Sequence, residues 1–515
     1  MSNFEFQRAI VRPVDEYNQK LVSRVHPPDW VNPQPADCYD LLVIGAGTAG
    51  LVVAAGAAGL DLGLKVALVE KHLLGGDCLN FGCVPSKTII RSARVVGEIW
   101  RARNFGINAP QYVDVDFPAV MQRMRQIRAS ISYQDSAERL QKLGIDVFLG
   151  SAKFVNSNTV EVGDRILQFQ KAAITTGATA ARPSIPGIEQ AGYLTNQTVF
   201  SLIQRPPRLA VLGAGPVGCE LAQAFRRLGC EVVLFHRHSQ ILNKEDADAA
   251  EIVQNFFLKE KIRLLLDCQV QRVEKTRDGK TIYFSCNGKE DWVTVDEILA
   301  AAGRLPNVEG LNLESADVEY DCSKGVKVND YLQTTNPNIF AAGDVCMDWK
   351  FTHAADAAAR IVIKNALLSP FGWGRYKLSN LVIPWVTYTD PEIARVGMSE
   401  RQVQEKGMKV NTIKIPFSSV DRAIADGEEE GFVKILYKKG TDEILGATVV
   451  ARHAGEMISQ ITTAMVNKIG LNKLSSVIHP YPTQAEAIKK AADVYRRTLL
   501  TPKTKRFLKL LTRLS

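Results

Sequence analysis

The sequence predicts an α/β protein in which two doubly wound, Rossmann-like nucleotide-binding domains precede a mixed α+β domain. Two strand–glycine turn–helix–strand units predict this fold class, one starting at Cys38 and the other at Arg208. In the first unit the apolar run CYDLLVI has the length of a buried parallel strand, an alanine-rich stretch follows, and the run KVALVE ends at Glu70. From about Leu381 the pattern changes to short strands and two helices, which predicts the third domain.

Length and composition agree with several soluble domains. A chain of 515 residues is too long for one hydrophobic core, and 46% hydrophobic with 23% charged residues is ordinary for a globular protein. The nine cysteines are odd in number and irregularly spaced, which favours a reducing, cytoplasmic compartment over a secreted disulfide framework. The N-terminal residues lack the apolar core of a signal peptide. The uncharged run Leu41 to Leu60 contains five glycines, so we expect a strand and a tightly packed helix rather than a membrane span.

The net charge of +8 is concentrated at the C-terminal end. The last twenty residues, from Arg496, hold seven basic residues and no acid, which leaves +1 for the rest of the chain and argues against a nucleic-acid-binding protein. From Pro502 the tail has the pattern of a short basic amphipathic helix, with apolar residues Phe507, Leu508, Leu510, Leu511 and Leu514. Such a helix could bind an anionic membrane surface, bind a protein partner, or pack on its own dimer.

The first glycine fingerprint is G-x-G-x-x-G at Gly45, Gly47 and Gly50, directly after a predicted strand. In this arrangement the first glycine permits the tight turn, the second lets the backbone approach a pyrophosphate, and the third lets helix and strand pack closely. Glu70 stands twenty residues after Gly50, where an acid would accept a hydrogen bond from a ribose 2′-hydroxyl. The unit therefore predicts a dinucleotide site.

The second fingerprint consists of Gly213, Gly215 and Gly218. The strand that follows ends in VVLFHRH, with Arg237 and His238 and without a carboxylate. An acid there would repel a 2′-phosphate, whereas arginine can bind one, so the sequence favours NADPH over NADH. NADH, with the basic residues as a merely solvated strand end, stays the alternative.

The stretch GGDCLNFGCVPSK places Cys78 and Cys83 five residues apart. A zinc site lacks a second pair of ligands at suitable spacing. Two ordinary buried thiols, or a redox disulfide across a distorted helical turn, both fit the residues. Lys87 nearby would favour a thiolate or an anionic flavin.

This stretch resembles the active-site signature of the FAD-dependent pyridine nucleotide–disulfide oxidoreductases. The resemblance spans about residues 38–495 and includes TTG ending at Gly177, GRLPN from Gly303, AAGDV around Asp344 and YTDPEIARVG from Tyr388. It implies a glutathione reductase-like fold with an N-terminal extension (1–37), an FAD-binding domain (38–187 and 309–378), an NAD(P)H-binding domain (188–308), a dimerisation domain (379–495) and a basic tail (496–515).

The resemblance also implies roles for individual residues. The FAD contacts would be Gly45, Gly47, Gly50, Glu70, Gly177, Gly303 and Asp344. Cys83 would be the thiol next to the flavin, Cys78 the outer thiol that meets the acceptor, and Glu220 the acid paired with Lys87. Hydride would pass from the nicotinamide to FAD, and electrons from FAD through Cys83 to Cys78. The expected homodimer would share each active site between its subunits.

The segment IHPYPTQAE bears on the acceptor. Members that reduce disulfides carry a histidine directly before Pro-Thr, followed by a glutamate, to move a proton to the leaving thiol. Here Pro482-Thr483 and Glu486 align, but Tyr481 takes the place of the histidine, and a phenol with a pKa of about 10 is a poor base at neutral pH. His479, two residues upstream, could replace it only through a shift in register.

A tyrosine here is similar to the mercuric reductase branch of the family. In that reading Cys78 and Cys83 hold Hg(II) transiently as substrate, and no proton shuttle is needed. The chain departs from that branch because it lacks a C-terminal cysteine pair and a cysteine domain before Cys38. The alternatives are dihydrolipoamide dehydrogenase or another disulfide reductase, a quinone or diaphorase-type reductase, and a flavin-bearing redox sensor. Cys78 is also a candidate for a glutathione adduct.

Overall fold

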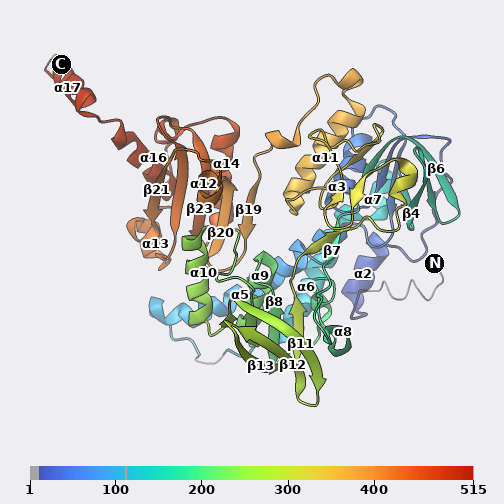
Figure 1. Ribbon diagram of the computed structural model, residues 1–515, viewed down its shortest axis with the longest axis horizontal. Helices are drawn as coiled ribbons and strands as arrows, with labels where there is room; N and C mark the ends of the chain where they lie inside the picture. The colour runs from blue at the N-terminus through green and yellow to red at the C-terminus, as the bar shows by residue number, and fades with distance from the viewer. Residues whose placement is uncertain (1–10, 111–112, 514–515) are drawn as a thin grey trace.

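The apolar strands of the first unit form the centre of the first domain in this computed structural model, which describes residues 11–110 and 113–513 (Figure 1). Strand β1 (Tyr39–Ile44) pairs in parallel with β2 (Val66–Glu70) and β6 (Arg165–Ile174). The flanking strands are β3 (Ile145–Leu149) beside β2, β18 (Ile339–Ala341) beside β6, and the antiparallel β5 (Thr159–Val162) and β4 (Ala152–Asn156). Leu41 and Val43 enter one hydrophobic core and Leu42 and Ile44 another, so β1 is buried on both faces.

Helices cover this sheet and connect its strands. Helix α3 (Thr48–Ala58) packs against α11 (Thr352–Leu367) on one face. The α-helices in the described part of residues 76–142 are α4 (Gly76–Asn80), α5 (Cys83–Arg101), α6 (Phe117–Ile131) and α7 (Ala137–Lys142), and short 3-10 helices follow α5 and α6. Strands β7 (Ala178–Ala180) and β15 (Arg304–Pro306) pair where the chain enters and leaves the second domain, and α8 (Ile188–Ala191) follows β7. Strands β16 (Tyr320–Asp321) and β17 (Gly325–Val326) pair with each other and pack in a core of the first domain.

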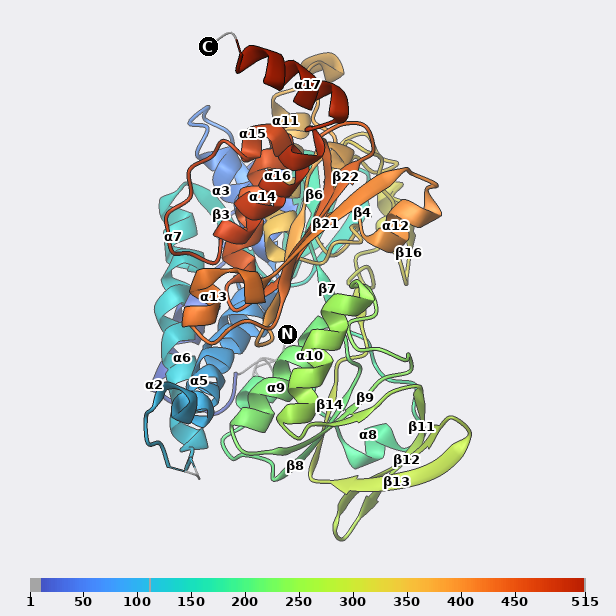
Figure 2. The ribbon, with the colours of Figure 1, turned by 90° about the vertical axis from the view of Figure 1, so that its left-hand side faces the viewer.

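The second domain repeats the parallel arrangement. Its sheet has the order β10 (Arg263–Leu265), β9 (Glu231–Phe235), β8 (Arg208–Leu212), β14 (Glu297–Ala300). Helices α9 (Pro216–Arg227) and α10 (Ala247–Lys259) follow its first strands, and Pro216 occupies the first helical position of α9, where no amide donor is needed. An antiparallel sheet of β11 (Cys268–Thr276), β12 (Gly279–Cys286) and β13 (Lys289–Val295) lies at the bottom of Figures 1 and 2.

The third domain is an antiparallel five-stranded sheet with helices, as the change of texture at Leu381 predicts. Its strand order is β19 (Pro384–Thr387), β20 (Glu392–Gly397), β23 (Ile444–Ala451), β22 (Phe432–Lys438), β21 (Val410–Pro416). The two long helices are α14 (Ala454–Val466) and α16 (Glu486–Thr498), and the short ones are α12 (Glu400–Glu405), α13 (Asp421–Ala425) and α15 (Leu471–Leu474). The predicted fold class is therefore confirmed.

The N-terminal extension, for which the sequence analysis predicts no secondary structure, contains a helix. Residues 1–10 lie outside the described part of the chain, but α2 (Glu16–Val25) packs on the first domain, with Leu21 and Val25 completely buried. Asp15 caps the helix by accepting a hydrogen bond from the Asn18 amide, and Arg128 Nη2 donates to Asn18 Oδ1 at 2.7 Å. The i, i+4 spacing of the two apolar residues after an aspartate cap was the signal for this helix.

The C-terminal tail begins later than expected. Helix α16 continues through Arg496 to Thr498, and a separate helix α17 (Pro502–Leu511) follows, capped by the Thr501 side chain. No described residue of α17 is buried, and Figure 1 shows the helix extending away from the third domain. Leu514 of the predicted apolar face lies outside the described residues. Among the described residues no helix is long and apolar enough to cross a membrane.

Candidate active site

The two closely spaced cysteines lie on either side of a break between two helices. Cys78 lies in α4, Cys83 is the first residue of α5, and Gly82 between them has φ −134° and ψ −113°. A Cβ atom on Gly82 would lie 2.8 Å from the Asp77 carbonyl oxygen, so the turn requires glycine. Both cysteines are free thiols, with Cys83 exposed and Cys78 half-buried. The distorted helical turn is present, and the structure describes the reduced form of the pair.

The two thiols share one proton unequally. A hydrogen bond from Cys78 lowers the pKa of Cys83 to about 6, with further help from Thr352 and the positive charge of Lys87. The same hydrogen bond, and then burial, raises the pKa of Cys78. Thr352 Oγ1 lies 3.4 Å from Cys83 Sγ. At neutral pH the negative charge therefore lies on Cys83, and the proton remains on Cys78.

Lys87 lies one helical turn beyond Cys83 and forms an ion pair with Glu220. Lys87 Nζ donates to Glu220 Oε2 at 2.8 Å, and the Glu220 side chain is only 6% exposed. Burial alone would lower the pKa of Lys87, but the charge of Glu220 raises it. Glu220 Oε1 also accepts a hydrogen bond from the Tyr388 amide at 2.9 Å. Glu220 thus joins α5 of the first domain, α9 of the second and the start of the third.

In the first fingerprint Gly45 and Gly50 are closely packed, whereas Gly47 is open. A Cβ atom at Gly45 would lie 2.6 Å from the Thr175 carbonyl oxygen, and one at Gly50 would lie 1.8 Å from the Gly45 carbonyl oxygen. At Gly47, the N-cap of α3, the nearest atom would be the Gly76 Cα at 3.9 Å. The loop is therefore fixed by packing and accessible at the helix N-terminus, which fits a pyrophosphate group.

In the second fingerprint Gly213 and Gly218 are likewise closely packed, and Gly215 is open. A Cβ atom at Gly213 would lie 2.5 Å from the Ala301 carbonyl oxygen, and one at Gly218 would lie 1.9 Å from the Gly213 carbonyl oxygen. Nothing lies within 4 Å of such an atom at Gly215, the N-cap of α9. Both units therefore fit a dinucleotide phosphate at the middle glycine.

The remaining predicted cofactor residues surround the first unit. Glu70 accepts hydrogen bonds from the Ala46 and His72 amides, both at 2.7 Å. Burial raises the pKa of Asp344, which lies 3.3 Å from Arg304 Nε. Gly177 and Gly303 have positive φ angles of 69° and 119°, with open space where a side chain would stand. Their contacts with FAD stay predictions.

The sequence analysis missed two residues of this region. Arg304 Nη2 donates to Asp77 Oδ2 and to the Ala178 carbonyl oxygen, both at 2.5 Å, so it connects α4 to Asp344. It belongs to the GRLPN motif, which was the available signal. Thr352 begins α11, more than 260 residues from Cys83, and no local pattern marks it.

At the second unit the basic strand end is accessible. Arg237 and His238 are exposed and contact each other, with 3.3 Å between Arg237 Nε and His238 Nε2. The Ala214 amide donates to His236 Nδ1 at 3.3 Å. Burial, then the charges of His238 and Arg237, lower the pKa of His236, which favours the neutral ring.

The residues expected to reach the partner subunit lie on the third domain. Tyr481 is 71% exposed, and its hydroxyl donates to Asp421 Oδ2 at 2.9 Å, which raises the pKa of the phenol. His479 Nε2 lies 2.6 Å from Gln460 Nε2. Glu486 begins α16 and contacts Lys490 at 3.8 Å. Which of Tyr481 and His479 faces the cysteine pair stays a prediction.

Comparison with models of known protein families shows the family to which this chain belongs. The family model for pyridine nucleotide-disulphide oxidoreductases matches residues 39–359, and the model for the dimerisation domain of the same family matches residues 383–492. The chain belongs to the pyridine nucleotide-disulphide oxidoreductase family. Members of this family depend on FAD and use NAD(P)H, and the dimerisation domain indicates a homodimer.

Curated relatives in this family carry two different activities. A mercuric reductase of Lysinibacillus sphaericus is 34% identical over 463 residues, which cover 90% of this chain and 84% of the relative. A dihydrolipoyl dehydrogenase of Chlamydia muridarum is also 34% identical, over 457 residues that cover 87% of this chain and 95% of the relative. Sequence identity alone therefore leaves the acceptor open.

Solved structures agree with the family assignment. The HOCl-induced flavoprotein disulfide reductase RclA from Escherichia coli has a TM-score of 0.78 and 27% identity, covering 88% of this chain and 99% of its own. A Cu(II) complex of RclA has a TM-score of 0.77. LpdA from Mycobacterium tuberculosis has a TM-score of 0.79 and 26% identity, covering 90% and 100%.

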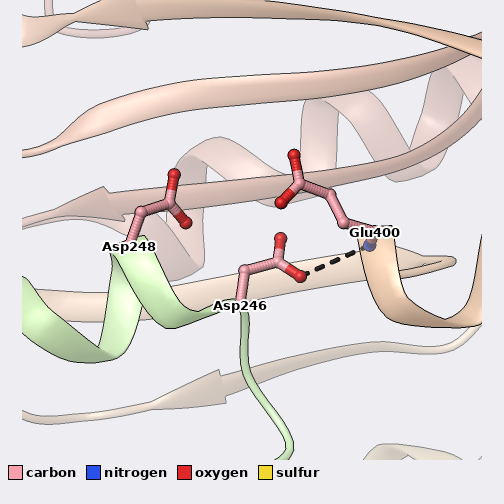
Figure 3. A group of neighbouring side chains, drawn as sticks. All are labelled: Asp246, Asp248 and Glu400. Carbon is pink, nitrogen blue, oxygen red and sulfur yellow. Dashed lines mark hydrogen bonds between the residues drawn. The ribbon is translucent and has the colours of Figure 1, made fainter.

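A group of carboxylates in this pyridine nucleotide-disulphide oxidoreductase has the spacing of a metal site but contains its own cation. Oxygen atoms of Asp246, Asp248 and Glu400 lie within 4.8 Å of one another (Figure 3). The ammonium of Lys434, which is 2% exposed, lies 2.8 Å from Asp246, 2.8 Å from Asp248 and 3.2 Å from Glu400. This cluster therefore joins α10 to the dimerisation domain, and Lys434 occupies the place of a metal ion.

Proposed function

We propose that the protein is an NADPH-dependent flavoprotein reductase whose Cys78–Cys83 pair delivers two electrons to a soft metal ion, with Hg(II) as the leading acceptor. The observation that carries this proposal is the position of Cys78 and Cys83 on either side of Gly82, next to the Lys87–Glu220 ion pair, with a hydrogen bond from Cys78 that lowers the pKa of Cys83. Two thiols that share one proton are suited to binding a soft cation, because thiolates are its preferred ligands.

The chain's own residues would act in a defined order. FAD, which the loop of Gly45, Gly47 and Gly50 would hold, would supply the electron pair taken from NADPH. Cys78, as the outer thiol, would meet the metal ion and release its proton, since metal binding requires the thiolate. Cys83, which is already ionised, would be the second ligand. Lys87 would keep a positive charge beside Cys83, and the overall change would be NADPH and Hg(II) to NADP⁺, a proton and elemental mercury.

Tyr481 supports a metal ion over a disulfide as acceptor. Reduction of a disulfide needs a proton for the leaving thiol, and a base of suitable pKa must hold it. The hydrogen bond to Asp421 raises the pKa of Tyr481, so at neutral pH the phenol is a hydrogen-bond donor and not a base. We infer that Tyr481 of one subunit orients the bound metal species at the cysteine pair of the other.

The similarity to mercuric reductases, and to RclA, which has been solved as a Cu(II) complex, supports a metal acceptor. Equal identity to dihydrolipoyl dehydrogenases keeps disulfide reduction as the second candidate. The glutathione adduct and the cytoplasmic location stay predictions. The hydrogen bond to Cys83 raises the pKa of Cys78 in the reduced pair.

The test is anaerobic NADPH oxidation by the purified FAD-loaded enzyme with Hg(II) in excess thiol, comparing wild type with Cys78→Ser. Mercury-dependent turnover that releases elemental mercury and is lost in the variant supports the proposal. Turnover with lipoamide instead supports a disulfide reductase. Quinone reduction that survives Cys78→Ser supports a diaphorase-type enzyme, and a stable reduced form without turnover supports a redox sensor.

We also propose that α17 binds an anionic membrane surface. At 100° per residue, Lys505, Arg506 and Lys509 fall on one face of this helix. The opposite face carries Phe507, Leu508, Leu510 and Leu511, which are 60%, 43%, 55% and 44% exposed. A helix with a cationic face and an uncovered apolar face suits the boundary between anionic headgroups and acyl chains, and a homodimer presents two of them.

A further inference from the structure

The described residues contain one disulfide bond, and it lies outside the site described above. Cys268 and Cys286 are bonded, whereas the other seven cysteines are free. Cys268 is the first residue of β11 and Cys286 the last of β12. The antiparallel register places them directly opposite each other, with 4.2 Å between their Cα atoms. The bond therefore closes the open end of the β11–β12 hairpin.

The segment that ends in Cys268 is bonded to the basic strand end of the second nucleotide-binding unit. The His236 amide donates to the Leu265 carbonyl oxygen at 2.9 Å, and the Cys268 amide donates to the His236 carbonyl oxygen at 3.0 Å. The Asp267 amide donates to the His238 carbonyl oxygen at 3.1 Å. Three backbone hydrogen bonds thus join the segment from Leu265 to Cys268 to the strand end that is predicted to bind the coenzyme phosphate. One of them is made by Cys268, which is one half of the disulfide.

We propose that Cys268 and Cys286 form a reversible redox pair that sets the affinity of the second nucleotide-binding unit for NADPH. This inference rests on the proposed function, because it takes that unit as the NADPH site. In a reducing compartment, disulfides that form are generally redox-responsive and not structural. Cys268 is 4% exposed and Cys286 is half-buried, so a soluble reagent reaches Cys286 first.

The oxidant would be a low-molecular-weight disulfide such as oxidised glutathione. The thiolate of Cys286 attacks one sulfur of that disulfide, forming a mixed disulfide and releasing one small thiol. The thiol of Cys268 then loses its proton and attacks the Cys286 sulfur, which forms the protein disulfide and releases the second small thiol. Two protein thiols are oxidised and one small disulfide is reduced, and the reverse reaction uses two small thiols.

The disulfide would affect coenzyme binding because it orders the strand end at His236 and His238. In the oxidised form a covalent bond fixes the start of β11, and through it the backbone of His236 and His238. In the reduced form only hydrogen bonds hold this segment, so coenzyme binding has to order it. We expect binding to weaken about fivefold on reduction, which corresponds to the cost of ordering about one backbone residue.

The experiment uses the full-length FAD-loaded enzyme equilibrated in glutathione buffers of different redox ratio. Alkylation and mass spectrometry measure the Cys268–Cys286 bond, and calorimetric titration with NADP⁺, which cannot reduce the enzyme, measures affinity. In wild type we expect the bond to follow the buffer and NADP⁺ to bind about fivefold more tightly to the oxidised form. In Cys286→Ser the difference should vanish, although Cys78 and Cys83 still respond. In Cys322→Ser, which removes an exposed free cysteine elsewhere, it should persist.

Absence of the bond in every buffer, or equal affinity in both forms, would overturn this inference. If only NAD⁺ binds, the coenzyme assigned above is wrong. The same titration with NAD⁺ then decides whether the disulfide controls affinity at this site.

Discussion

Glu70 and His236 occupy equivalent positions in the two nucleotide-binding units. Glu70 is the last residue of the second strand of its unit, and His236 directly follows the second strand of the other. Each accepts a hydrogen bond from the amide of the residue between the first two glycines: Glu70 from Ala46 at 2.7 Å and His236 from Ala214 at 3.3 Å. The hydrogen bond is thus retained while the charge of the acceptor changes. A neutral or positive group in place of a carboxylate tolerates a 2′-phosphate, which is the physical basis of the predicted NADPH preference.

We expect His236→Glu to reverse that preference. A carboxylate beside the 2′-phosphate adds like-charge repulsion, so kcat/KM for NADPH should fall by about tenfold or more while that for NADH is kept. Steady-state kinetics with both coenzymes measure the ratio. The matched control is His236→Gln, which keeps an acceptor for the Ala214 amide without charge and should change the ratio little. An unchanged ratio in His236→Glu would place the phosphate elsewhere.

The reactivity of Cys83 should depend on pH with a midpoint of about 6, the pKa given by its hydrogen bond from Cys78. The thiolate is the nucleophile, so the rate at which the reduced enzyme is alkylated should rise through this pH and be constant between about pH 7 and about pH 8. Peptide mass spectrometry after timed iodoacetamide treatment measures it. Cys78→Ala should move the midpoint upward, and Cys78→Ser, which keeps a hydroxyl donor, should move it less. A wild-type midpoint near the ordinary thiol value of about 8.5 would contradict the assignment.

Glu220→Gln should weaken both the site and the fold. The side-chain oxygen of the glutamine can still accept a hydrogen bond from the Tyr388 amide. Lys87 loses the opposite charge beside it, so the pKa of Lys87 should fall, since burial disfavours the charged ammonium. We expect a loss of about 1–3 kcal/mol of unfolding free energy and about tenfold slower reduction of the cysteine pair. Denaturant unfolding and rapid-mixing kinetics measure these. Glu319→Gln breaks an exposed pair with Lys327 of 2.7 Å and should cost less than about 0.5 kcal/mol.

Lys434→Met should destabilise the contact between the second and third domains. It leaves Asp246, Asp248 and Glu400 without their shared cation, and removing one partner of a buried pair costs about 3–5 kcal/mol. Lys414→Met is the matched control, because Lys414 also pairs with Asp248, at 2.7 Å, but is 45% exposed; it should cost about 1 kcal/mol or less. Calorimetric unfolding compares the two. Stabilisation of the wild type by added Ca²⁺ would instead identify a metal site there.

The α17 proposal predicts binding of the full-length protein to phosphatidylcholine vesicles that contain phosphatidylserine, and not to phosphatidylcholine alone. Each basic residue near an anionic surface is worth about 1 kcal/mol, or about fivefold, so reversing Lys505, Arg506 and Lys509 to glutamate should abolish flotation with the vesicles. Reversal of the exposed Lys142, Lys259 and Lys327 is the control for net charge.

Removal of residues 501–515 should likewise abolish vesicle binding and leave NADPH oxidation unchanged. Binding that survives this deletion would contradict the proposal. A deletion that dissociates the dimer instead, measured by sedimentation, would show that α17 packs on the second subunit.

The local pattern of the chain determined much of this protein. The positive φ angles of Gly45 and Gly213 and the apolar runs are local properties of the chain, so both nucleotide-binding units and the third domain could be predicted. The spacing of Cys78 and Cys83 marked the chemistry for the same reason. Where a pattern was short, as in α2, the sequence analysis overlooked an ordered element whose stability comes from packing on the first domain.

Contacts between distant segments needed the tertiary structure. The Cys268–Cys286 bond depends on strand register, the position of Thr352 beside Cys83 on the packing of α11, and the pairing of Lys434 with three carboxylates on the contact between two domains. Which thiol carries the proton was likewise decided by the geometry around Cys78 and Cys83. Charge and hydrogen bonding act over a few ångströms in space, whatever the separation in sequence, so residue types could be chosen by pattern but their partners only by the fold.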